Sequence, residues 1–291
     1  CLPQRYGTLL EEEIPEVDLF LGTGEVPRIA THIATLCDDS PLQNRSFIGA
    51  PDFLMNSSHR RILSTPPHIA YLKIAEGCDN HCSYCVIPAV RGTFRSRKMD
   101  DILREAQILA DGGVKEIILT AQETTRYGYD LGSTPRLPAL LQEMTSIEGI
   151  EWIRLLYTHP ARLDDELFRT IRDCDKVCSY IDIPVQHIDN GILRSMNRGG
   201  GSALIREKIE HAREIIPGVA LRTSLIVGFP GETEEAFDRL LAFVREVRLD
   251  HVGAFEYSNE EGTAAAALPD HIPEEIKRLR REIIMEEQAN I

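Results

Sequence analysis

Runs of apolar residues divide most of the chain into short strands, and each strand is followed by a helix. The predicted strands are Ile69–Ala75, Glu116–Ala121, Trp152–Leu156, Tyr180–Val185, Ala220–Val227 and Val252–Tyr257. Apolar positions at helical spacing fill the intervals, over Met99–Ala110, Leu137–Met144, Asp164–Arg172, Gly191–Met196, Ala203–Ile215 and Glu234–Val247. Strands that alternate with helices predict a parallel sheet covered by helices.

The number of these units limits the architecture. Six strand–helix units occupy about 190 residues, whereas a closed eight-stranded barrel needs about 250. We therefore predict an α/β fold built as an open, partial (β/α)6 barrel of the TIM type. A charged amphipathic helix over Glu274–Gln288 follows the last strand and could cover one edge of the sheet.

The first part of the chain has a different pattern, typical of the end of a small α/β unit. Val17–Gly22 is a predicted buried strand, and Pro27 stands in the first turn of a helix that continues to Leu36. Residues 37–67 lack periodicity and contain Pro-Pro and Ser-Ser pairs. We predict the tail of an N-terminal α/β domain at 1–36, a linker at 37–67 and the barrel at 68–291. Because the chain begins at Cys1, we expect it to be a fragment.

Composition and charge narrow the class of protein. Hydrophobic residues make up 43% of the chain and charged residues 27%, as in soluble globular proteins. A run of 18 apolar residues is missing, so we expect no membrane association. The net charge of −14 disfavours direct nucleic-acid binding and favours a basic protein partner. Seven cysteines, an odd number in a large chain, indicate a reducing cytoplasm.

The strongest chemical signal is a C-x3-C-x2-C loop formed by Cys78, Cys82 and Cys85, directly after the first barrel strand. Three thiolates on a short loop can bind three irons of a 4Fe–4S cube and leave the fourth iron open to a substrate. A structural zinc site is the alternative, and a redox thiol pair is a weaker one. Zinc needs four closed ligands, and His81 would have to fold back between the cysteines to be the fourth.

The loop resembles the signature of the radical S-adenosylmethionine (SAM) superfamily. In that superfamily the open iron binds the amino and carboxylate groups of SAM, and an electron from the cluster cleaves SAM to a 5′-deoxyadenosyl radical. The resemblance implies that Cys78, Cys82 and Cys85 are the cluster ligands and the catalytic centre. It also implies that Tyr84 packs against the cluster or SAM, and that the fold is the partial six-unit barrel of this superfamily.

Further segments across nearly all of residues 68–291 resemble the methylthiotransferase family: Tyr71–Cys78, Ile87-Pro88, Arg91-Gly92, Arg95–Arg97 and Ile226–Thr233. Four segments resemble the branch that modifies an aspartate of a small-subunit ribosomal protein: Cys1–Tyr6, Gln122–Asp130, Asp182–His187 and Met196–Gly200. Tyr157–Pro160 is more typical of the branches that modify tRNA adenosine. The resemblance implies conversion of the aspartate to 3-methylthioaspartate, with a tRNA adenosine methylthiotransferase and a non-enzymatic zinc-binding protein as alternatives.

The same resemblance implies site residues, cofactors and partners. Gln122 and Gln186 would hydrogen-bond the methionine or ribose of SAM, and the adenine would be lined by Ile226, Gly228 and Phe255. Cys1 matches the third ligand of a second 4Fe–4S cluster in an N-terminal domain, whose other two cysteines are absent here, as is a C-terminal TRAM domain. The parent protein would then bind two clusters and SAM, with this chain holding one cluster. Its partners would be the ribosomal protein and a reductase or flavodoxin-type electron donor.

Two other features have simpler interpretations. Arg91, Arg95 and Arg97 follow the cysteine loop and could form a solvated basic face, or bind the SAM carboxylate or the protein substrate. Gly228–Thr233 lacks the spacing and the lysine of a phosphate-binding loop. We predict that it is a strand-to-helix turn with Thr233 as the N-cap.

Overall fold

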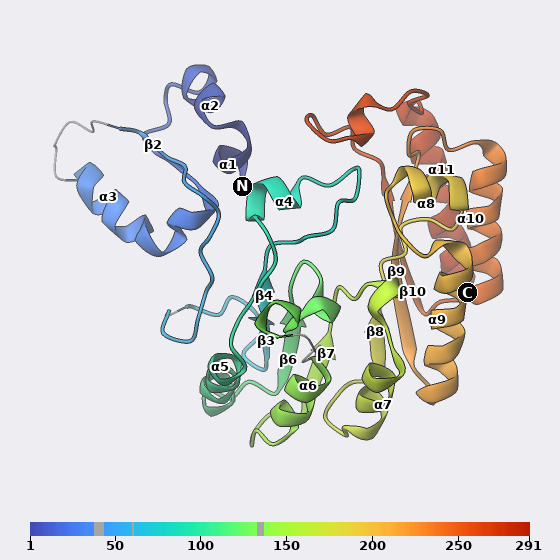
Figure 1. The fold of residues 1–291 in the computed structure, drawn as a ribbon, viewed down its shortest axis with the longest axis horizontal. Coiled ribbons are helices and arrows are strands. Elements are labelled where there is room, and N and C mark those ends of the chain that lie inside the picture. Colours follow the sequence, from blue (N-terminus) through green and yellow to red (C-terminus); the bar gives the residue numbers. More distant parts are fainter. Residues whose placement is uncertain (38–43, 60, 133–136) are drawn as a thin grey trace.

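The computed structural model describes residues 1–37, 44–59, 61–132 and 137–291, and its centre is a parallel sheet with helices along its outer side (Figure 1). The six described strands of this sheet are β3 (Ile69–Lys73), β6 (Glu116–Thr120), β7 (Trp152–Leu155), β8 (Tyr180–Asp182), β9 (Ala220–Val227) and β10 (His251–Glu256). They pair in parallel in the orders β3-β6-β7 and β8-β9-β10. A parallel bridge between Ile153 and Val177 joins the two halves. The predicted partial barrel is confirmed.

Helices connect the strands as the apolar spacing predicts. They are α5 (Met99–Asp111), α6 (Leu137–Thr145), α7 (Asp165–Asp173), α8 (Asn190–Ser195), α9 (Gly201–Ile215) and α10 (Glu234–Val247). α11 (Glu274–Ala289) follows β10 and packs against both β10 and α10. Each helix begins and ends within two residues of its predicted bounds. Within the described ranges, none of the helices combines the length and the apolar character that a membrane span requires.

β9 shows why the sheet has a covered outer face and a more open inner face. Its residues alternate between buried and half-buried positions, because successive side chains of a strand point to opposite faces. The buried set joins the apolar core that includes Leu240 and Phe243 of α10. The half-buried set of β9 faces the inside of the open barrel and contains Arg222, Ser224 and Ile226. The inner face is therefore where a ligand can meet strand residues.

The fourth strand of the barrel ends three residues earlier than predicted, at Asp182 instead of Val185. Pro184 has no backbone N–H, so the hydrogen-bond ladder cannot continue through it. The Thr223 hydroxyl replaces the missing bonds, since it donates to Ile183 O (2.7 Å) and accepts from Val185 N (3.2 Å). The chain returns to β9 at Gln186, which has a φ of +69°.

The N-terminal part contains α1 (Leu2–Tyr6), α2 (Thr8–Glu13), β1 (Phe20–Leu21), a 3-10 helix (Thr23–Arg28), α3 (Ile29–Cys37) and β2 (Ser46–Phe47). β2 lies inside the segment predicted to be a linker and pairs in parallel with β1. Further along that segment, the Ser57 N–H and hydroxyl donate to the Asp101 carboxylate on α5 at 2.9 and 2.7 Å. The segment is thus attached to its surroundings at two places. The division into three parts stays a prediction.

Candidate functional site

The three-cysteine loop runs between two short paired strands. β4 (Ala75–Glu76) pairs antiparallel with β5 (Arg95–Ser96), so the loop begins and ends at the same place. Gly77 opens the loop with a φ of +81°, and a Cβ there would lie 2.1 Å from the Thr93 carbonyl oxygen. Only glycine allows the two backbone segments to approach so closely. This approach fixes the position of Cys78, the next residue.

All three cysteines line one cavity of about 200 Å³. Cys78 is buried, whereas Cys82 and Cys85 are half-buried. Each sulfur accepts a hydrogen bond: Cys78 from the Asn80 N–H (3.4 Å), Cys82 from the Arg198 guanidinium (3.9 Å) and Cys85 from the Ile87 N–H (3.4 Å). Donors of this kind stabilise thiolate ligands of a metal centre.

The chemistry of this donor set fits an iron–sulfur cluster better than the alternatives. Burial raises the pKa of the Cys78 and Cys85 thiols, which disfavours a reactive thiol pair. His81 is exposed and does not line the cavity, so it is not placed as a fourth zinc ligand. Within the described ranges, no group of three or more His, Cys, Asp or Glu side chains could hold one metal ion. A 4Fe–4S cube binds its thiolates through different irons, so its ligands need not converge on one point.

Gln122 and Gln186, two predicted SAM contacts, line the same cavity from the ends of β6 and β8. Gln122 Nε2 donates to Glu76 Oε1 at 2.9 Å, which orients the amide. Its Oε1 is buried and has no hydrogen-bond partner in the described part of the chain. A buried acceptor in this state costs free energy unless a ligand supplies a donor. The arrangement therefore suits a ligand with an N–H or ammonium group.

A second cavity, of about 340 Å³, shares Tyr84 and Gln186 with the first. Its walls also include Ile226 on β9 and Phe255 on β10, which are predicted to line adenine. These two side chains provide apolar surface against which a planar ring can pack. Burial raises the pKa of Tyr84, so its phenol stays protonated at neutral pH. The structure thus brings five of the predicted SAM contacts to two neighbouring cavities: Tyr84, Gln122, Gln186, Ile226 and Phe255.

Gly228, also predicted to line adenine, lines neither cavity. Its N–H donates to Glu232 Oε2 at 2.8 Å, and a Cβ there would lie 2.3 Å from Cγ of Lys277 on α11. The close packing of α11 and the φ of +71° both favour a glycine here. The segment is the strand-to-helix turn that the sequence predicts, because Thr233 Oγ1 accepts from the Ala236 N–H at 3.2 Å and caps α10.

Known proteins resemble the chain in sequence. A sequence profile of the Radical SAM superfamily matches residues 72–244, which is more than half of the chain. The chain belongs to this superfamily. A relative from Syntrophus aciditrophicus, ribosomal protein uS12 methylthiotransferase RimO, is 56% identical over the whole chain, and one of the same name from Pelotomaculum thermopropionicum is 51% identical. The chain spans 64% and 65% of the lengths of these two relatives.

Solved structures share the fold of this radical SAM chain. Coproporphyrinogen III oxidase (HemN) from Escherichia coli matches 78% of this chain and 53% of its own, with a TM-score of 0.55 and 20% identity. Methylornithine synthase (PylB) matches 76% of this chain and 62% of its own, with a TM-score of 0.53 and 16% identity. At such low identities the likeness concerns the fold alone, and it agrees with the partial barrel described above.

In this radical SAM chain Cys1 lies apart from the two cavities. It is exposed, and Arg91 Nη2 donates to its sulfur at 3.3 Å. Arg91 also faces the Glu76 carboxylate at 3.7 Å, and Glu76 in turn holds Gln122. Cys1 is thus connected to the cavity through two side chains. Its role as a ligand of a second cluster stays a prediction.

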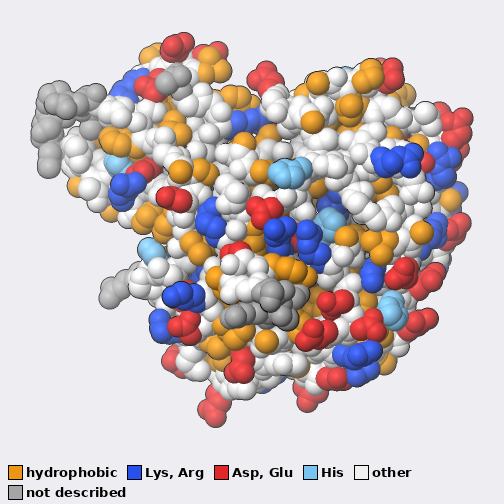
Figure 2. All heavy atoms as spheres, viewed as in Figure 1, with side chains coloured by type: hydrophobic (Ala, Val, Ile, Leu, Met, Phe, Trp, Pro, Cys, Tyr) orange, Lys and Arg blue, Asp and Glu red, His pale blue; other side chains and the backbone are white. Residues whose placement is uncertain are grey.

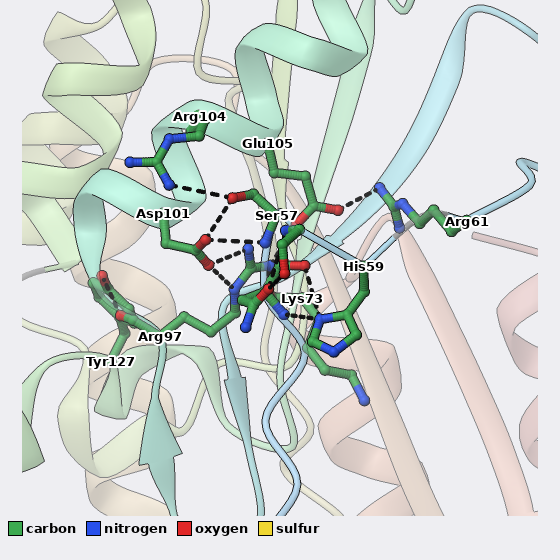
Figure 3. Close-up of polar contacts among 11 residues, drawn as sticks. Ser57, His59, Arg61, Lys73, Arg97, Asp101, Arg104, Glu105 and Tyr127 are labelled. Atoms are coloured by element: carbon green, nitrogen blue, oxygen red, sulfur yellow. Dashed lines mark hydrogen bonds and ion pairs between the residues drawn. The ribbon is translucent and has the colours of Figure 1, made fainter. Parts of the chain in front are cut away.

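Arg97, the last of the three arginines after the cysteine loop, is only 2% exposed. Its guanidinium forms ion pairs with Asp101 and Glu105 of α5, each at 2.6 Å, and donates to Lys73 O at 2.8 Å (Figure 3). Arg95 donates to backbone oxygens of two neighbouring loops. Neither a solvated basic face nor a ligand-binding role describes Arg97, because its donors already have internal partners. It attaches the end of the cysteine loop to the barrel.

The side chains of the first cavity that sequence reasoning did not assign to the site include Tyr157, His159 and Arg198. Burial, together with Arg198 and Arg162, lowers the pKa of His159 to about 3, so the ring is neutral at pH 7. Its Nδ1 accepts from the Ala161 N–H at 3.2 Å, and the proton is therefore on Nε2. The signal available for Tyr157 and His159 was their place after β7, since barrel chemistry gathers at the C-terminal ends of strands. Arg198 follows α8 and had no such signal.

Proposed function

We propose that the chain is the catalytic core of a methylthiotransferase that converts an aspartate of a small-subunit ribosomal protein to 3-methylthioaspartate. One observation carries the proposal: three cysteine thiols share a cavity with Gln122 and Gln186, and an apolar-walled cavity adjoins it. The names of the relatives that are 56% and 51% identical support the substrate. The proposal concerns the whole protein, of which this chain is a part.

Cys78, Cys82 and Cys85 would hold a 4Fe–4S cluster whose fourth iron is open to SAM. When bound, the cluster supplies the electron that splits SAM into methionine and a 5′-deoxyadenosyl radical. The N–H donors at the three sulfurs stabilise the thiolate form of the ligands. The burial that raises the pKa of Cys78 and Cys85 also limits the contact of these two sulfurs with water.

SAM would lie across both cavities. Gln122 Oε1, held in place by Glu76, would accept from an N–H of the SAM amino group and so gain the partner that it lacks. Gln186 lies where the cavities meet and hydrogen-bonds the methionine or ribose part. Ile226 and Phe255 cover the adenine ring. These residues orient the sulfonium; they do not take part in bond breaking themselves.

The net reaction replaces one C–H bond at the β-carbon of aspartate with a C–S–CH3 group. The hydrogen atom leaves on 5′-deoxyadenosine, and the methyl group comes from a second SAM, which becomes S-adenosylhomocysteine. We assign the sulfur to a donor at a second cluster of the parent protein, ligated in part by Cys1. The electrons come from a reductase or a flavodoxin-type partner.

Surface charge is consistent with a basic protein substrate in the cytoplasm. The net charge of the chain is −14. Acidic and basic side chains are interspersed over the face in Figure 2. A negative protein attracts a basic partner and repels the phosphates of nucleic acids. This favours a ribosomal protein over tRNA as the substrate.

The test compares cells with and without the gene for the full-length protein. Small-subunit ribosomal proteins are weighed by mass spectrometry, and total tRNA is digested to nucleosides in parallel. We expect one ribosomal protein to lose a methylthio group, and the wild-type gene but not Cys85→Ala to restore it. Loss of a methylthio-adenosine from tRNA instead would contradict the proposed substrate. Purified protein with one zinc and no acid-labile sulfide would contradict the cluster.

A further inference from the structure

Tyr157, the second residue after β7, has a backbone conformation that bulky residues rarely adopt. Its φ is +58°. The left-handed region is favourable for glycine and is costly for a residue with a large side chain. In the described ranges, five non-glycine residues have a positive φ: Tyr157, Gln186, Asn197, Arg248 and Asp270. Tyr157 is the aromatic one among them, and it lines the cavity of the three cysteines together with Gln186.

Hydrogen bonds on both sides hold Tyr157 in this conformation. Its N–H donates to Asp182 Oδ2 at 3.1 Å, and its carbonyl oxygen accepts from the Thr124 N–H at 2.9 Å and the Thr124 hydroxyl at 3.2 Å. The next residue, Thr158, donates through its N–H and hydroxyl to Asp182 O at 3.1 and 2.6 Å. Asp182 is fully buried and is itself bound by Arg222 at 2.7 Å. A costly conformation fixed by so many partners is typical of functional positions.

The Tyr157 side chain is not part of the core. It is 45% exposed, although it lies beside buried cysteine and histidine side chains. It lines the first cavity and not the second, so it lies away from the walls assigned to adenine. The pKa of Arg222, on the inner face of β9, is raised above its usual value. Burial lowers this pKa, but the nearby Asp182 carboxylate outweighs burial, and Tyr180 and Tyr157 add smaller contributions in the same direction as Asp182. The phenol of Tyr157 is thus near the inner face of the barrel.

We propose that Tyr157 contacts the substrate, and that its ring packs against the peptide segment that carries the reacting carbon and holds it over the cavity where SAM is cleaved. The inference rests on the proposed function. A half-exposed aromatic ring with a hydroxyl offers a peptide both an apolar face and a hydrogen-bonding group. The turn at residue 157 places this ring at the cavity, and an ordinary extended backbone would direct it elsewhere.

The experiment uses the full-length protein with Tyr157→Gly, Tyr157→Phe and, as a matched control, Arg248→Gly. Arg248 also has a positive φ (+48°), but it is exposed. It is the C-cap of α10 and is distant in sequence from the cysteine loop. Both glycine variants relieve backbone strain, so neither should lower the melting temperature. The measured quantities are 5′-deoxyadenosine released with and without substrate, methylthiolated product, and KM for SAM.

We expect Tyr157→Gly to release about tenfold or more 5′-deoxyadenosine per product, because a misplaced substrate is not reached by the radical. Tyr157→Phe should show a smaller rise in this ratio. Arg248→Gly changes a residue that lines neither cavity, so it should match the wild type in this ratio, in substrate-free SAM cleavage and in KM for SAM. An unchanged ratio of 5′-deoxyadenosine to product in Tyr157→Gly overturns the inference, whether or not the KM for SAM changes. If the wild-type protein itself releases no 5′-deoxyadenosine, the proposed function is what fails.

Discussion

Replacement of Arg97 by methionine tests whether the base of the cysteine loop depends on buried ion pairs. The Arg97 side chain is 1% exposed and lies between the carboxylates of Asp101 and Glu105, at 2.6 Å from each (Figure 3). Methionine keeps much of the apolar stem but removes the charge and all the donors. Two largely buried carboxylates then lose a cationic partner.

The size of the effect follows from what remains. Removal of one partner from a buried pair costs about 3–5 kcal/mol. Glu105 keeps Arg61 at 3.1 Å, and Asp101 keeps the two donors of Ser57, so the cost should fall at the lower end. We expect the free energy of unfolding to fall by about 3 kcal/mol. At roughly 2 °C per kcal/mol for a chain of this size, Tm should fall by about 6 °C.

The assay is urea unfolding followed by tryptophan fluorescence. Trp152 is the single tryptophan of the chain and lies on β7, so its signal reports on the barrel. Arg169→Met is the matched control, because Arg169 and Asp165 form an i,i+4 pair at 3.0 Å with side chains 59% and 44% exposed. The control should cost less than about 0.5 kcal/mol. Equal losses in the two variants, or a loss below about 1 kcal/mol for Arg97→Met, would refute the reasoning.

Three further predictions concern the loop, the ligand and the pH dependence. The Gly77→Ala variant should lose most of its bound iron and sulfide in chemical analysis, because the added Cβ would lie 2.1 Å from a backbone oxygen. The control variant Gly113→Ala should keep its iron and sulfide, because Gly113 also has a positive φ (+93°) but nothing lies within 4 Å of an added Cβ. Gln122→Ala should raise KM for SAM by about tenfold with a smaller change in kcat, since a buried hydrogen bond to a charged group is lost; an unchanged KM would contradict the orientation described. Burial raises the pKa of Asp101, but hydrogen bonds from Ser57 and the pair with Arg97 outweigh it and hold the pKa below its usual value. The stability that Asp101 contributes is present above about pH 4 and is lost as the pH falls through the lower pKa of the folded state. Proteolysis near Ser57 should therefore accelerate in acid. In the Asp101→Asn variant, the rate of this proteolysis should no longer depend on pH in that range.

The barrel could be predicted from sequence because its signals are local. Buried parallel strands give short apolar runs, and the helices between them show apolar positions at helical spacing. The cysteine loop is equally local, since its three sulfurs come from eight consecutive residues, Cys78–Cys85. The end of the fourth strand was wrong because Pro184 was not weighed, although the loss of its N–H is itself a local signal.

What the sequence did not predict depends on partners that are distant along the chain. In the sequence, Arg97 looks like part of a basic face. Its burial follows from the packing of α5 on β3, which the neighbouring sequence does not show. The assignment of Gly228 as an adenine contact stays a prediction, but the sequence did not show that its φ of +71° and the close approach of Lys277, 49 residues later, also require a glycine there. The backbone of Tyr157 is fixed by Asp182 and Thr124, which come from the ends of two other strands. No pattern within a single element records such contacts.

Asp182 shows why stability and site geometry cannot be varied independently at this end of the barrel. Its carboxylate accepts from Arg222 across the β8–β9 pair and from the Tyr157 N–H, and its backbone oxygen accepts from Thr158. A buried carboxylate must keep its partners, so a change at Asp182 would weaken the sheet and release the turn together. The Tyr157 side chain contributes little to the core, and its removal leaves the Asp182 contacts to the backbone in place. A substitution at Tyr157 therefore tests the function of this turn without removing its structural support, whereas a substitution at Asp182 changes both.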